Sequence, residues 1–429
     1  MSAPVIVPCA THPISRAQVG QNALKVLNRL KQAGYASYLV GGCVRDLMLG
    51  REPKDFDVVT DARPEEIRKL FRNARLIGRR FRLAHVRFGR EIIEVATFRG
   101  VPELTKDNDA LARKSPEGRI LRDNVFGTQE EDALRRDFTV NALYYDIRDY
   151  SVVDYVGGVD DLKRGVLRII GKPDIRYRED PVRLLRALRF SAKLGFKVEP
   201  KTAAPIGELG HLLLDVPPAR MFEEVLKLFH GGSALNTYEL LRKHDLFKYI
   251  FPMTESALAR ERNGYPLTMV PSALANTDER VSQDKPVTPA FLFATMLWEP
   301  MRRQMETLVT QGRTPHLALQ LATSDVLTRQ SQRIAIPRRF SIPVREIWAL
   351  QPRFERRVGR QALRLLEHKR FRAAYDFLLL RIQAGEERAE IGDWWTRFQE
   401  VDDRERRVMV RELSKTTAKI RRRRRKRKT

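Results

Sequence analysis

The stretch LVGGCVRD at positions 39–46, followed by DFDVVT at positions 55–60, decides how the first part of the chain folds. The apolar residues before the two glycines predict a strand that turns sharply into a short helix. Asp55 and Asp57 stand two positions apart in a second predicted strand, where alternate residues share a face. The sequence therefore predicts two carboxylates that point the same way beside a glycine turn.

This arrangement suits a phosphate chain with divalent cations. Two carboxylates on one face can hold a pair of cations against phosphates. Gly41 and Gly42 let backbone N–H groups come close to an anion, and the start of the next helix favours negative charge. Each feature alone has a simpler explanation, a tight turn or a capping acidic pair, so the interpretation depends on their occurring together at this spacing.

The chain is strongly basic, with 80 Lys and Arg against 54 Asp and Glu in 429 residues and a formal net charge of +26. Removing the eight charges of one run near the C-terminus from this total still leaves +18. A broadly basic surface favours a polyanion, so the sequence predicts nucleic acid as the partner. The residues of the run are Arg421, Arg422, Arg423, Arg424, Arg425, Lys426, Arg427 and Lys428.

Cysteine content and hydropathy limit the compartment. Cys9 and Cys43 are the two cysteines, which suits a reducing environment and excludes a four-cysteine zinc cluster. No apolar run approaches the roughly 18 residues of a membrane span. The N-terminus lacks the basic and apolar blocks of a secretory signal. We expect a cytoplasmic protein without a membrane span.

The apolar pattern predicts an α+β chain of several domains. Strands and short helices alternate in the first part and indicate a small domain with a mixed sheet, after which the helical period returns. A polar stretch with prolines and a charged end indicate further boundaries. The expected parts are a disordered segment over 1–14, a mixed-sheet domain over 15–160, a helical neck over 161–252, an irregular linker over 253–289, a helical domain over 290–403 and a basic tail over 404–429.

Several elements are expected individually. Ser15 is a candidate cap for a helix that runs to about Ala33 and ends at Gly34. The four tryptophans all lie in the C-terminal half and are expected to pack its core rather than stack on bases. The other expected helices cover 64–71, 176–194, 219–229, 237–250 and 361–383, and the other expected strands cover 76–77, 85–88 and 92–98.

Two further stretches carry residues suited to nucleotide chemistry. EIIEVATFR at 91–99 places Glu94 inside an apolar strand, where a carboxylate is costly unless it is paired or binds metal. RRDFTVNAL at 135–143 contains Arg136, whose forked donors suit phosphate, together with Asp137 and Asn141. Asp137 is either an acceptor for the nucleotide or a catalytic carboxylate, and Asn141 can read a ribose hydroxyl or a base edge.

A third stretch, EDPVRLLRALRF at 179–190, repeats charged residues every three positions and so predicts one charged stripe along a helix. Such a stripe is usually a solvated face. Three arginines within two turns repel one another, however, unless an anion offsets their charge. The residues of the stripe are Asp180, Arg183, Arg186 and Arg189.

Together these motifs resemble the active-site signature of the polymerase-β type of nucleotidyltransferase, in the branch that holds bacterial poly(A) polymerases and tRNA CCA-adding enzymes. The stretch LIGRRFRLAHV at 76–86, with Arg79 and Arg80, looks like a signature that the poly(A) polymerases carry and the CCA-adding relatives lack. NVFGTQEEDA at 124–133 and the arginine-rich C-terminus also look like the polymerase version.

The resemblance implies template-independent addition of AMP from ATP to RNA 3′ ends with release of pyrophosphate, in mRNA polyadenylation and RNA turnover. Asp55 and Asp57 would hold two Mg²⁺ ions, with Mn²⁺ as an alternative metal. Either Glu94 or Asp137 would complete the metal site, and the sequence leaves both open.

The resemblance also implies roles for single residues. Gly41, Gly42 and Arg45 would grip the triphosphate, and Asp46 would orient Arg45 rather than bind metal. A hydrogen-bonding pocket rejects a base that leaves its polar groups unpaired, which would select adenine. The remaining roles are Arg136 and Asn141 in the nucleotide pocket, Asp180 and Arg183 at the nucleobase, Arg186 and Arg189 at phosphates, and Arg79, Arg80 and the run 421–428 at RNA. The resemblance further implies a catalytic domain over 15–160, nucleobase recognition and RNA binding by the neck over 161–252, and RNA binding by the helical domain over 290–403.

Two other functions stay open, a tRNA CCA-adding enzyme and a non-catalytic RNA-binding protein. The expected partners are RNA 3′ ends, ATP and RNA-decay proteins, and the expected state is a monomer. His244 and Asp245 also fit the start of a metal phosphohydrolase site, but the seven histidines offer no convincing partner set. A capping or core role is therefore preferred for this pair.

Overall fold

The computed structural model describes residues 3–78, 82–100, 112–114, 120–123, 125–259 and 268–413. Backbone contacts divide the chain into two compact units, residues 1–212 and 213–429, and each is described by itself. The expected boundary at residue 160 therefore falls inside the first unit. No helix among the described residues is both long and apolar enough to cross a membrane.

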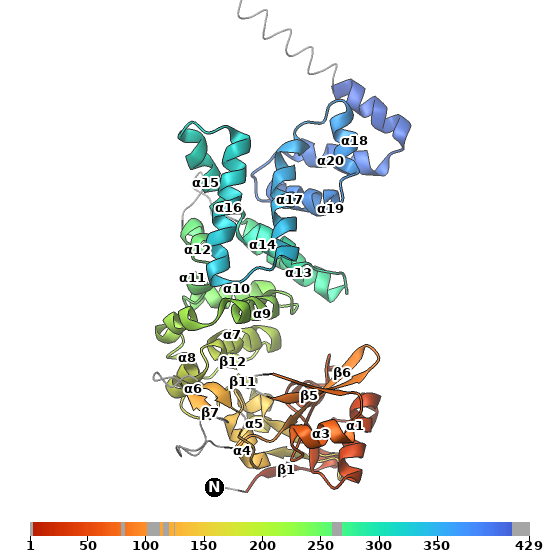
Figure 1. Ribbon diagram of the computed structural model, residues 1–429, viewed down its shortest axis with the longest axis vertical. Helices are drawn as coiled ribbons and strands as arrows, with labels where there is room; N and C mark the ends of the chain where they lie inside the picture. Colours follow the sequence, from red (N-terminus) through yellow and green to blue (C-terminus); the bar gives the residue numbers. More distant parts are fainter. Residues whose placement is uncertain are drawn as a thin grey trace, which may run out of the picture. The chain divides into compact units, whose positions relative to one another are not determined.

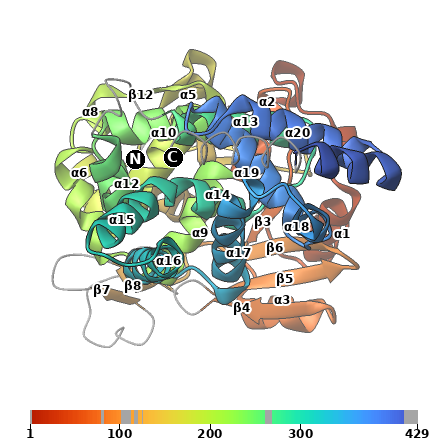
Figure 2. The same ribbon diagram turned by 90° about the horizontal axis from the view of Figure 1, so that it is seen from above.

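The first unit is built on an eight-stranded mixed sheet, and Figure 2 shows β3, β6, β5 and β4 side by side. Neighbouring strands are antiparallel except for β3 and β6, which run parallel. In order across the sheet the strands are β1 (Val5–Val7), β10 (Val152–Asp154), β9 (Leu143–Tyr145), β2 (Ser37–Val40), β3 (Asp57–Thr60), β6 (Glu91–Thr97), β5 (Leu83–Phe88) and β4 (Ala74–Ile77).

Helices and two small sheets complete this unit (Figure 1). The small sheets pair β7 (Ala112–Lys114) with β8 (Ile120–Asp123), and β11 (Val166–Leu167) with β12 (Lys197–Val198). The α-helices are α1 (Gln21–Gln32), α2 (Gly42–Met48), α3 (Pro64–Leu70), α4 (Gln129–Arg135), α5 (Gly158–Arg164), α6 (Pro173–Glu179), α7 (Val182–Leu194) and α8 (Pro200–Ala203). The 3₁₀ helices are η1 (Cys9–Thr11), η2 (Arg16–Gln18), η4 (Thr139–Asn141) and η5 (Glu208–Asp215), the last of which crosses into the second unit.

Strand alternation decides where the acidic motif points. Val40 of β2, Val59 of β3 and Tyr144 of β9 share one face of the sheet and pack in one cluster with Ala133 of α4. Asp57 lies two positions before Val59 in the same strand, so its side chain leaves the sheet on this same face. The sheet thus directs Asp57 toward the side that α4 covers.

Residues 3–14 contain a strand and a short 3₁₀ helix, which corrects the expectation of a disordered segment over 1–14. β1 pairs with β10, and Ile6 stands opposite Val153. The strand is three residues long, too short for its alternation to be recognised in the sequence. Val5 and Ile6 remain 59% and 58% exposed.

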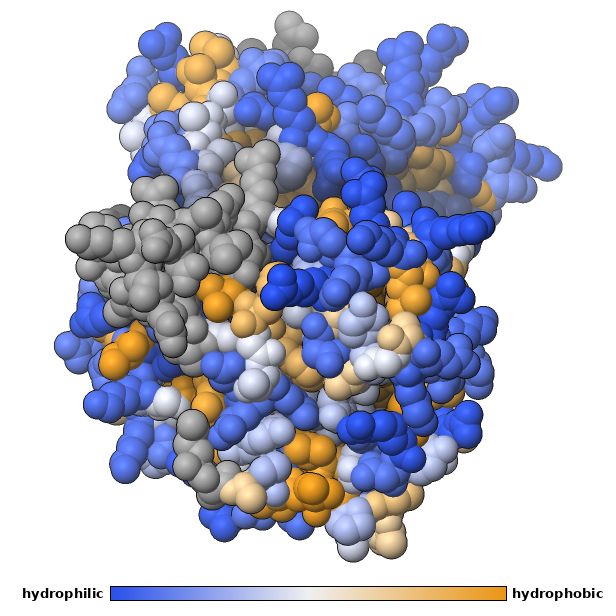
Figure 3. All heavy atoms as spheres, turned by 60° about the horizontal axis from the view of Figure 1, so that its bottom comes forward, coloured by the Kyte–Doolittle hydropathy of each residue, from blue (hydrophilic) through white to orange (hydrophobic). Residues whose placement is uncertain are grey.

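Figure 3 shows that hydrophilic side chains cover most of the surface in view and that hydrophobic side chains are exposed only in small patches.

Two expected helices begin or break differently. Ser15 caps the short η2, and α1 starts only after Gly20, because the chain is extended at that glycine. The helix expected over 176–194 is two helices, since Asp180 has extended backbone angles and Pro181 precedes the new start. The residue before a proline is disfavoured in the helical conformation, and this explains the break.

Among its described residues the second unit consists of helices joined by turns and loops, and it has no strand. Its helices are α9 (Pro218–Phe229), α10 (Ala234–Lys243), α11 (Phe247–Ile250), α12 (Pro252–Leu258), α13 (Met269–Ser282), α14 (Pro289–Met296), α15 (Trp298–Thr310), α16 (Pro315–Arg333), α17 (Arg338–Phe354), α18 (Arg360–Leu366), α19 (Phe371–Gln383) and α20 (Ala389–Glu400). Trp298, Trp348 and Trp395 are buried in its core, as expected, and Trp394 packs partly buried against Trp395.

Four expectations for this unit need correction. The helix expected over 237–250 breaks at Asp245, whose φ of +58° ends α10. The helix expected over 361–383 is α18 and α19, separated at 367–370. The expected linker 253–289 holds α12 and α13, and the expected tail begins with helical residues 403–413. Polar composition indicated loops here, but helices with a narrow buried face can also be mostly polar.

Candidate active site

The acidic part of the site lies where β3 and β6 run parallel. Asp57 opens β3 and stands opposite Glu94 of β6 in the register, so the two carboxylates sit on adjacent strands. Asp55 precedes β3 by two residues and is exposed. The strand therefore contains only the second aspartate of the motif, and the first lies in the approach to it.

The electrostatics of Asp57 favour a cation. Burial raises the pKa of Asp57 to about 6, the charges of Glu94 and Asp55 add to the rise, and Arg136 opposes it. A bound divalent cation would supply the missing positive charge, and carboxylate oxygens are the ligands that Mg²⁺ prefers. These three carboxylates therefore fit Mg²⁺ chemically. Among the described residues, no three His, Cys, Asp or Glu side chains already stand in an arrangement that could hold a metal ion.

Glu94 has a second neighbour, His85 of β5. The Nε2 atom of His85 lies 3.1 Å from a carboxylate oxygen of Glu94, and the register places the two residues opposite each other. The side chain of Glu94 is 52% exposed, which leaves it open to a ligand. His85 belongs to the polymerase-like stretch 76–86, which also contains Arg79 and Arg80.

The glycine turn brings the backbone against two arginines. Gly41 has φ +79° and ψ −130°, a conformation that side chains strain. A Cβ on Gly41 would lie 3.4 Å from Nη1 of Arg136 and 3.7 Å from the carbonyl oxygen of Asn141. Gly42 begins α2, and a Cβ there would lie 3.6 Å from Nη2 of Arg45. A turn of this shape lets backbone N–H groups approach an anion.

Arg45 is buried and held on two sides. Its Nη1 donates to Oδ1 of Asn141 over 2.6 Å, while its Nε and Nη2 donate to Oδ1 of Asp46 over 2.8 and 2.7 Å. Its guanidinium also lies 5.4 Å from the ring centre of Phe190 in α7. The contact by which Asp46 was expected to orient Arg45 is therefore present.

Asp137 is engaged by protein groups around its carboxylate. Arg186 donates to its Oδ2 from Nε over 2.8 Å and also from Nη2, and the N–H of Phe138 donates to its Oδ1 over 2.8 Å. Nδ2 of Asn141 donates to the same Oδ1 over 3.3 Å. Burial alone would raise the pKa of Asp137, but Arg186 and these hydrogen bonds outweigh it and hold the pKa at about 2.

Arg136 is held in place by side chains of α4 and β9. Its Nε donates to Oδ2 of Asp132 over 3.0 Å and to the hydroxyl of Tyr144 over 3.1 Å, and that hydroxyl donates to Asp132 over 2.8 Å. Burial disfavours both charges, yet their attraction lowers the pKa of Asp132 and raises the pKa of Arg136. Arg136, the arginine expected at the nucleotide, is therefore held in place by mutual hydrogen bonds with Asp132 and Tyr144.

The charged stripe expected over 180–189 is not one helical face. Asp180 ends α6, whereas Arg183 lies in α7, is only 9% exposed and donates to the carbonyl of Arg176 over 2.8 Å and to Glu179 over 3.2 Å. Arg176 donates to Glu179 over 2.7 Å. Burial lowers the pKa of Arg176 to about 10, and the charge of Arg183 contributes to this.

Phe190 was not recognised as a site residue. The guanidinium groups of Arg189, Arg186 and Arg45 lie 4.3, 5.2 and 5.4 Å from its ring centre. Its position at the end of a charged stretch was the available signal. The other residues that support the site and were not recognised are Asp132, Tyr144, Arg176 and Glu179.

The thiol of Cys43 lies under the glycine turn. It donates to the carbonyl of Val40 over 3.3 Å, and burial raises its pKa to about 12, with the charge of Asp57 contributing. Cys43 and the exposed Cys9 are both free. The residues expected to bind RNA, Arg79, Arg80 and the run 421–428, lie outside the described residues.

The chain is similar to known proteins over nearly its whole length. The poly A polymerase head domain matches residues 37–168, the probable RNA and SrmB-binding site of polymerase A matches 195–258, and the polymerase A arginine-rich C-terminus matches 311–429. Poly(A) polymerase I of Escherichia coli O157:H7 is 50% identical over 427 residues, 99% of this chain and 92% of the relative. The chain belongs to the poly(A) polymerase family. This membership confirms the resemblance drawn from the motifs and the enzyme class, a polynucleotide adenylyltransferase.

This member of the poly(A) polymerase family is also similar to more distant relatives and to solved structures. Poly(A) polymerase I of Haemophilus influenzae is 46% identical over 95% of this chain and 90% of the relative. The CCA-adding enzyme of Geobacillus stearothermophilus is 36% identical over 54% of each chain. A solved structure of the Bacillus stearothermophilus CCA-adding enzyme in complex with CTP matches with a TM-score of 0.58 and 26% identity over 89% of this chain and 82% of that one. The expected α+β fold is confirmed.

Proposed function

We propose that the chain adds AMP from ATP to RNA 3′ ends without a template and releases pyrophosphate. Family membership supports the reaction. The single structural observation that carries it is the register of Asp57 against Glu94 beside the glycine turn. Two acidic side chains of adjacent strands next to a backbone that can approach phosphate suit phosphoryl transfer, in which positioning and charge stabilisation do most of the catalysis.

For the metal we propose Asp55, Asp57 and Glu94 as ligands. When bound, Mg²⁺ would neutralise triphosphate charge and lower the pKa of the RNA 3′-hydroxyl, with Mn²⁺ as an alternative. Glu94 is preferred over Asp137 because Glu94 is half exposed beside Asp57, whereas the oxygens of Asp137 already accept from Arg186 and main-chain and amide groups. In this proposal Asp137 fixes Arg186 and Asn141 instead.

The nucleotide would be held by the residues around the glycine turn. The backbone of Gly41 and Gly42 would contact the phosphates, with Arg45 and Arg136 supplying positive charge next to them. Both arginines are pre-positioned, by Asn141 and by the Asp132–Tyr144 pair respectively, so little side-chain entropy is lost on binding.

For base selection we propose Asp180 with Arg183, and for phosphates Arg186 and Arg189. The contacts of Arg183 with Glu179 and the carbonyl of Arg176 support a role in which Arg183 is held in place from behind. A buried, pre-oriented donor of this kind discriminates because a wrong base leaves it unpaired.

The test of the reaction is the product ladder on a generic RNA primer with each NTP in turn. Long tails from ATP alone are expected. A requirement for CTP and a stop after three additions would instead identify a CCA-adding enzyme, the activity named for relatives that match about half of this chain. Absence of any metal-dependent incorporation would favour a non-catalytic RNA-binding protein.

The metal assignment is tested by replacing single carboxylates. Asp55→Asn, Asp57→Asn and Glu94→Gln should each abolish tailing while RNA binding persists, because phosphate contacts dominate RNA affinity. Asp61→Asn, an exposed acid just past β3, is the matched control and should tail normally. If Asp137→Asn abolishes metal-dependent tailing and Glu94→Gln retains it, the preference for Glu94 over Asp137 as a metal ligand is wrong.

In the cell we propose a role in mRNA polyadenylation and RNA turnover in the cytoplasm, as a monomer that meets RNA-decay proteins. The basic composition and the reducing-compartment cysteines support this. Loss of poly(A) on decay intermediates in cells lacking the protein, restored by the wild type and not by the Asp57→Asn variant, is the expected result.

A further inference from the structure

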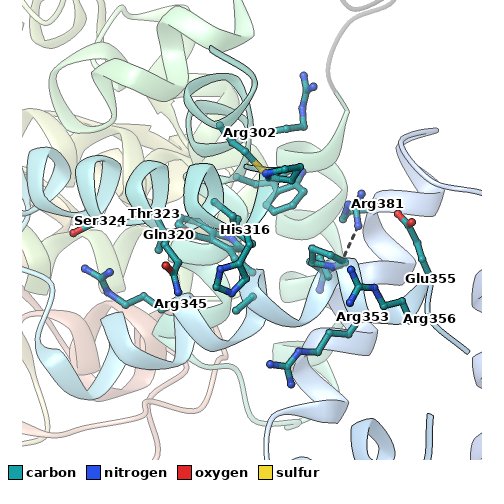
Figure 4. Close-up of a pocket in the computed structure, with 18 residues that line it drawn as sticks. Arg302, His316, Gln320, Thr323, Ser324, Arg345, Arg353, Glu355, Arg356 and Arg381 are labelled. Carbon is teal, nitrogen blue, oxygen red and sulfur yellow. Dashed lines mark hydrogen bonds between the residues drawn. The ribbon is translucent and has the colours of Figure 1, made fainter. Parts of the chain in front are cut away.

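A cavity of about 940 Å³ lies within the second unit and shares no residue with the candidate active site. Side chains of α15, α16, α17 and α19 form its walls (Figure 4). Sites for small molecules typically have volumes of roughly 300–1,000 Å³. The cavity is therefore large enough for a ligand of nucleotide size.

One wall of the cavity is apolar. Nε1 of Trp298 donates to Glu386 over 2.8 Å, and Nε1 of Trp348 donates to the carbonyl of Ala294 over 3.1 Å. Because both indole N–H groups are used inside the protein, the two indoles, which are 6% and 0% exposed, give the cavity an apolar boundary. The other apolar residues of this wall are Met305, Leu319 and Ala349.

The rim of the cavity is cationic. Among its described lining residues are five arginines and a single carboxylate, Glu355. Arg302 is one of the five, but Glu299 neutralises it over 2.6 Å and Glu306 also pairs with it. A structural role accounts for Arg302, so it does not carry the argument.

Arg345, Arg353 and Arg356 have no such explanation. All three are exposed residues of α17 or the turn that follows it, and none forms an ion pair with another described residue. In the view of Figure 4, His316 of α16 lies between Arg345 on one side and Arg356 on the other. Among the described lining residues, Glu355 is the one carboxylate beside these three cations.

Arg381 adds a cation at the base of the cavity. Its Nη1 donates to Gln351 over 3.2 Å, and its guanidinium lies 4.9 Å from the ring centre of Trp298. Its Nε is buried without a hydrogen bond among the described residues, and the nearest carboxylate oxygens of Glu386 and Glu387 are both 3.6 Å away. These two carboxylates balance the charge of Arg381, as Glu299 balances that of Arg302, so Arg381 does not carry the argument.

We propose that this cavity is a second nucleotide site. A nucleotide joins a flat, largely apolar base to a phosphate. The base would lie against Trp298 and Met305, and the phosphate would take the forked donors of Arg345 and Arg353. Inorganic phosphate alone would leave the apolar wall unfilled. The proposal relies on the proposed function only in taking nucleotides or RNA as the ligand, and it covers a free nucleotide and a nucleotide within a strand.

The first test compares binding of AMP and of a short fluorescent oligoadenylate to matched double variants. Arg345→Gln with Arg353→Gln should weaken binding about tenfold, as expected when charge-assisted contacts to one phosphate are lost. Arg338→Gln with Arg339→Gln removes the same charge from the exposed start of α17 outside the cavity and should leave affinity almost unchanged. Equal affinities of the two double variants for both ligands would overturn the proposal.

The second test locates the ligand. Irradiation with 8-azido-AMP, or with an oligoadenylate carrying one 8-azidoadenosine, should label the peptide that contains His316 or Trp298. Labelling by the free nucleotide identifies a free-nucleotide site, and labelling by the strand alone identifies an RNA site. Label absent from these peptides with both probes would overturn the proposal.

Two further variants separate this proposal from the catalytic one. Ala349→Trp fills the cavity without changing its charge and should abolish the cavity label, with an unchanged melting temperature as the check on folding. Asp57→Asn should lose tailing and keep the cavity label. A wild-type protein that is labelled in the cavity but never tails RNA would refute the proposed function and leave the second site standing.

Discussion

At the scale of single residues, Asp57 is held in a charge state that the fold itself does not favour. Burial and two neighbouring carboxylates raise its pKa from 3.8 to about 6. Active sites commonly carry such unfavourable groups, because stability is given up where function needs charge. The consequence is measurable in the metal-free protein.

We predict that Asp57→Asn stabilises the metal-free protein at neutral pH by about 1–3 kcal/mol. A raised folded-state pKa means that the ionised group destabilises the fold above about 6, and that this cost disappears as the pH falls from about 6 toward 3.8. The gain should therefore be full at neutral pH and absent near pH 3.8. Urea unfolding at several pH values checks this, and a gain that does not depend on pH would contradict it.

The second residue-scale prediction concerns Gly41. Gly41→Ala should lower the free energy of unfolding by about 1–3 kcal/mol and weaken ATP binding, since a side chain strains the positive φ and adds a methyl group in contact with Arg136 beside the proposed phosphate site. Gly50→Ala is the control, because Gly50 also has positive φ but meets nothing within 4 Å. The control should lose stability and keep ATP affinity. Equal ATP affinities of the two variants would count against the phosphate turn.

Single residues of the site were predictable where a local pattern fixed them. The D-x-D spacing predicted two carboxylates on one strand face, but only Asp57 lies in β3. The place of Glu94 near these acids was implied by the family resemblance and not by the strand pattern. The sequence could not distinguish Glu94 from Asp137, since that depends on Arg186, which is 49 residues away from Asp137 in the chain. Long-range pairing of this kind leaves no local signal.

At the scale of elements, the break between α6 and α7 shapes the far wall of the site. Because of this break, the residues do not form one charged helical face. Instead, Glu179 forms ion pairs with both Arg176 and Arg183. All three side chains are at most 13% exposed. Two buried arginines in contact with one carboxylate depend on that carboxylate for charge balance.

We predict that Glu179→Gln lowers the free energy of unfolding by about 3 kcal/mol, because it leaves buried positive charges without their partner. Glu306→Gln on α15 removes an ion-pair partner that is 60% exposed and should cost less than about 1 kcal/mol. Urea unfolding followed by circular dichroism compares the two. Similar losses in both variants would show that Glu179 does not support this wall.

Elements were predictable when they were long and strongly periodic. α3, α9 and β6 lie close to where the apolar pattern placed them. β1 was missed because three residues carry too little pattern, and α13 because its buried face is only Met269, Val270, Ala273 and Leu274 amid polar residues. The pairing of β1 with β10 is set by contacts across most of the first unit, not by local propensity.

At the scale of the whole molecule, charge rather than any single contact should govern how RNA is captured. The net charge of +26 includes the eight basic residues of the run 421–428. Phosphate contacts by basic residues make affinity fall with salt in proportion to their number.

We predict that replacing the run 421–428 by glutamines weakens RNA binding and lowers the salt slope by up to about 5.6, given about 0.7 per phosphate contact on a single strand. Tailing on saturating primer should stay intact, because the candidate active site lies in the first unit. Fluorescence titrations across a salt series measure the slope. An unchanged slope would refute the prediction.

The contrast between the two thiols has a practical consequence. Cys9 is exposed, whereas Cys43 is buried beneath Gly41 with its pKa raised to about 12. A maleimide should therefore modify the native protein once, at Cys9, and reach Cys43 only during rare local opening. The rate of the second modification, followed by mass spectrometry, would report how often that turn opens, and ATP should slow it. The wild-type chain thus carries its own reporter, without any engineered cysteine.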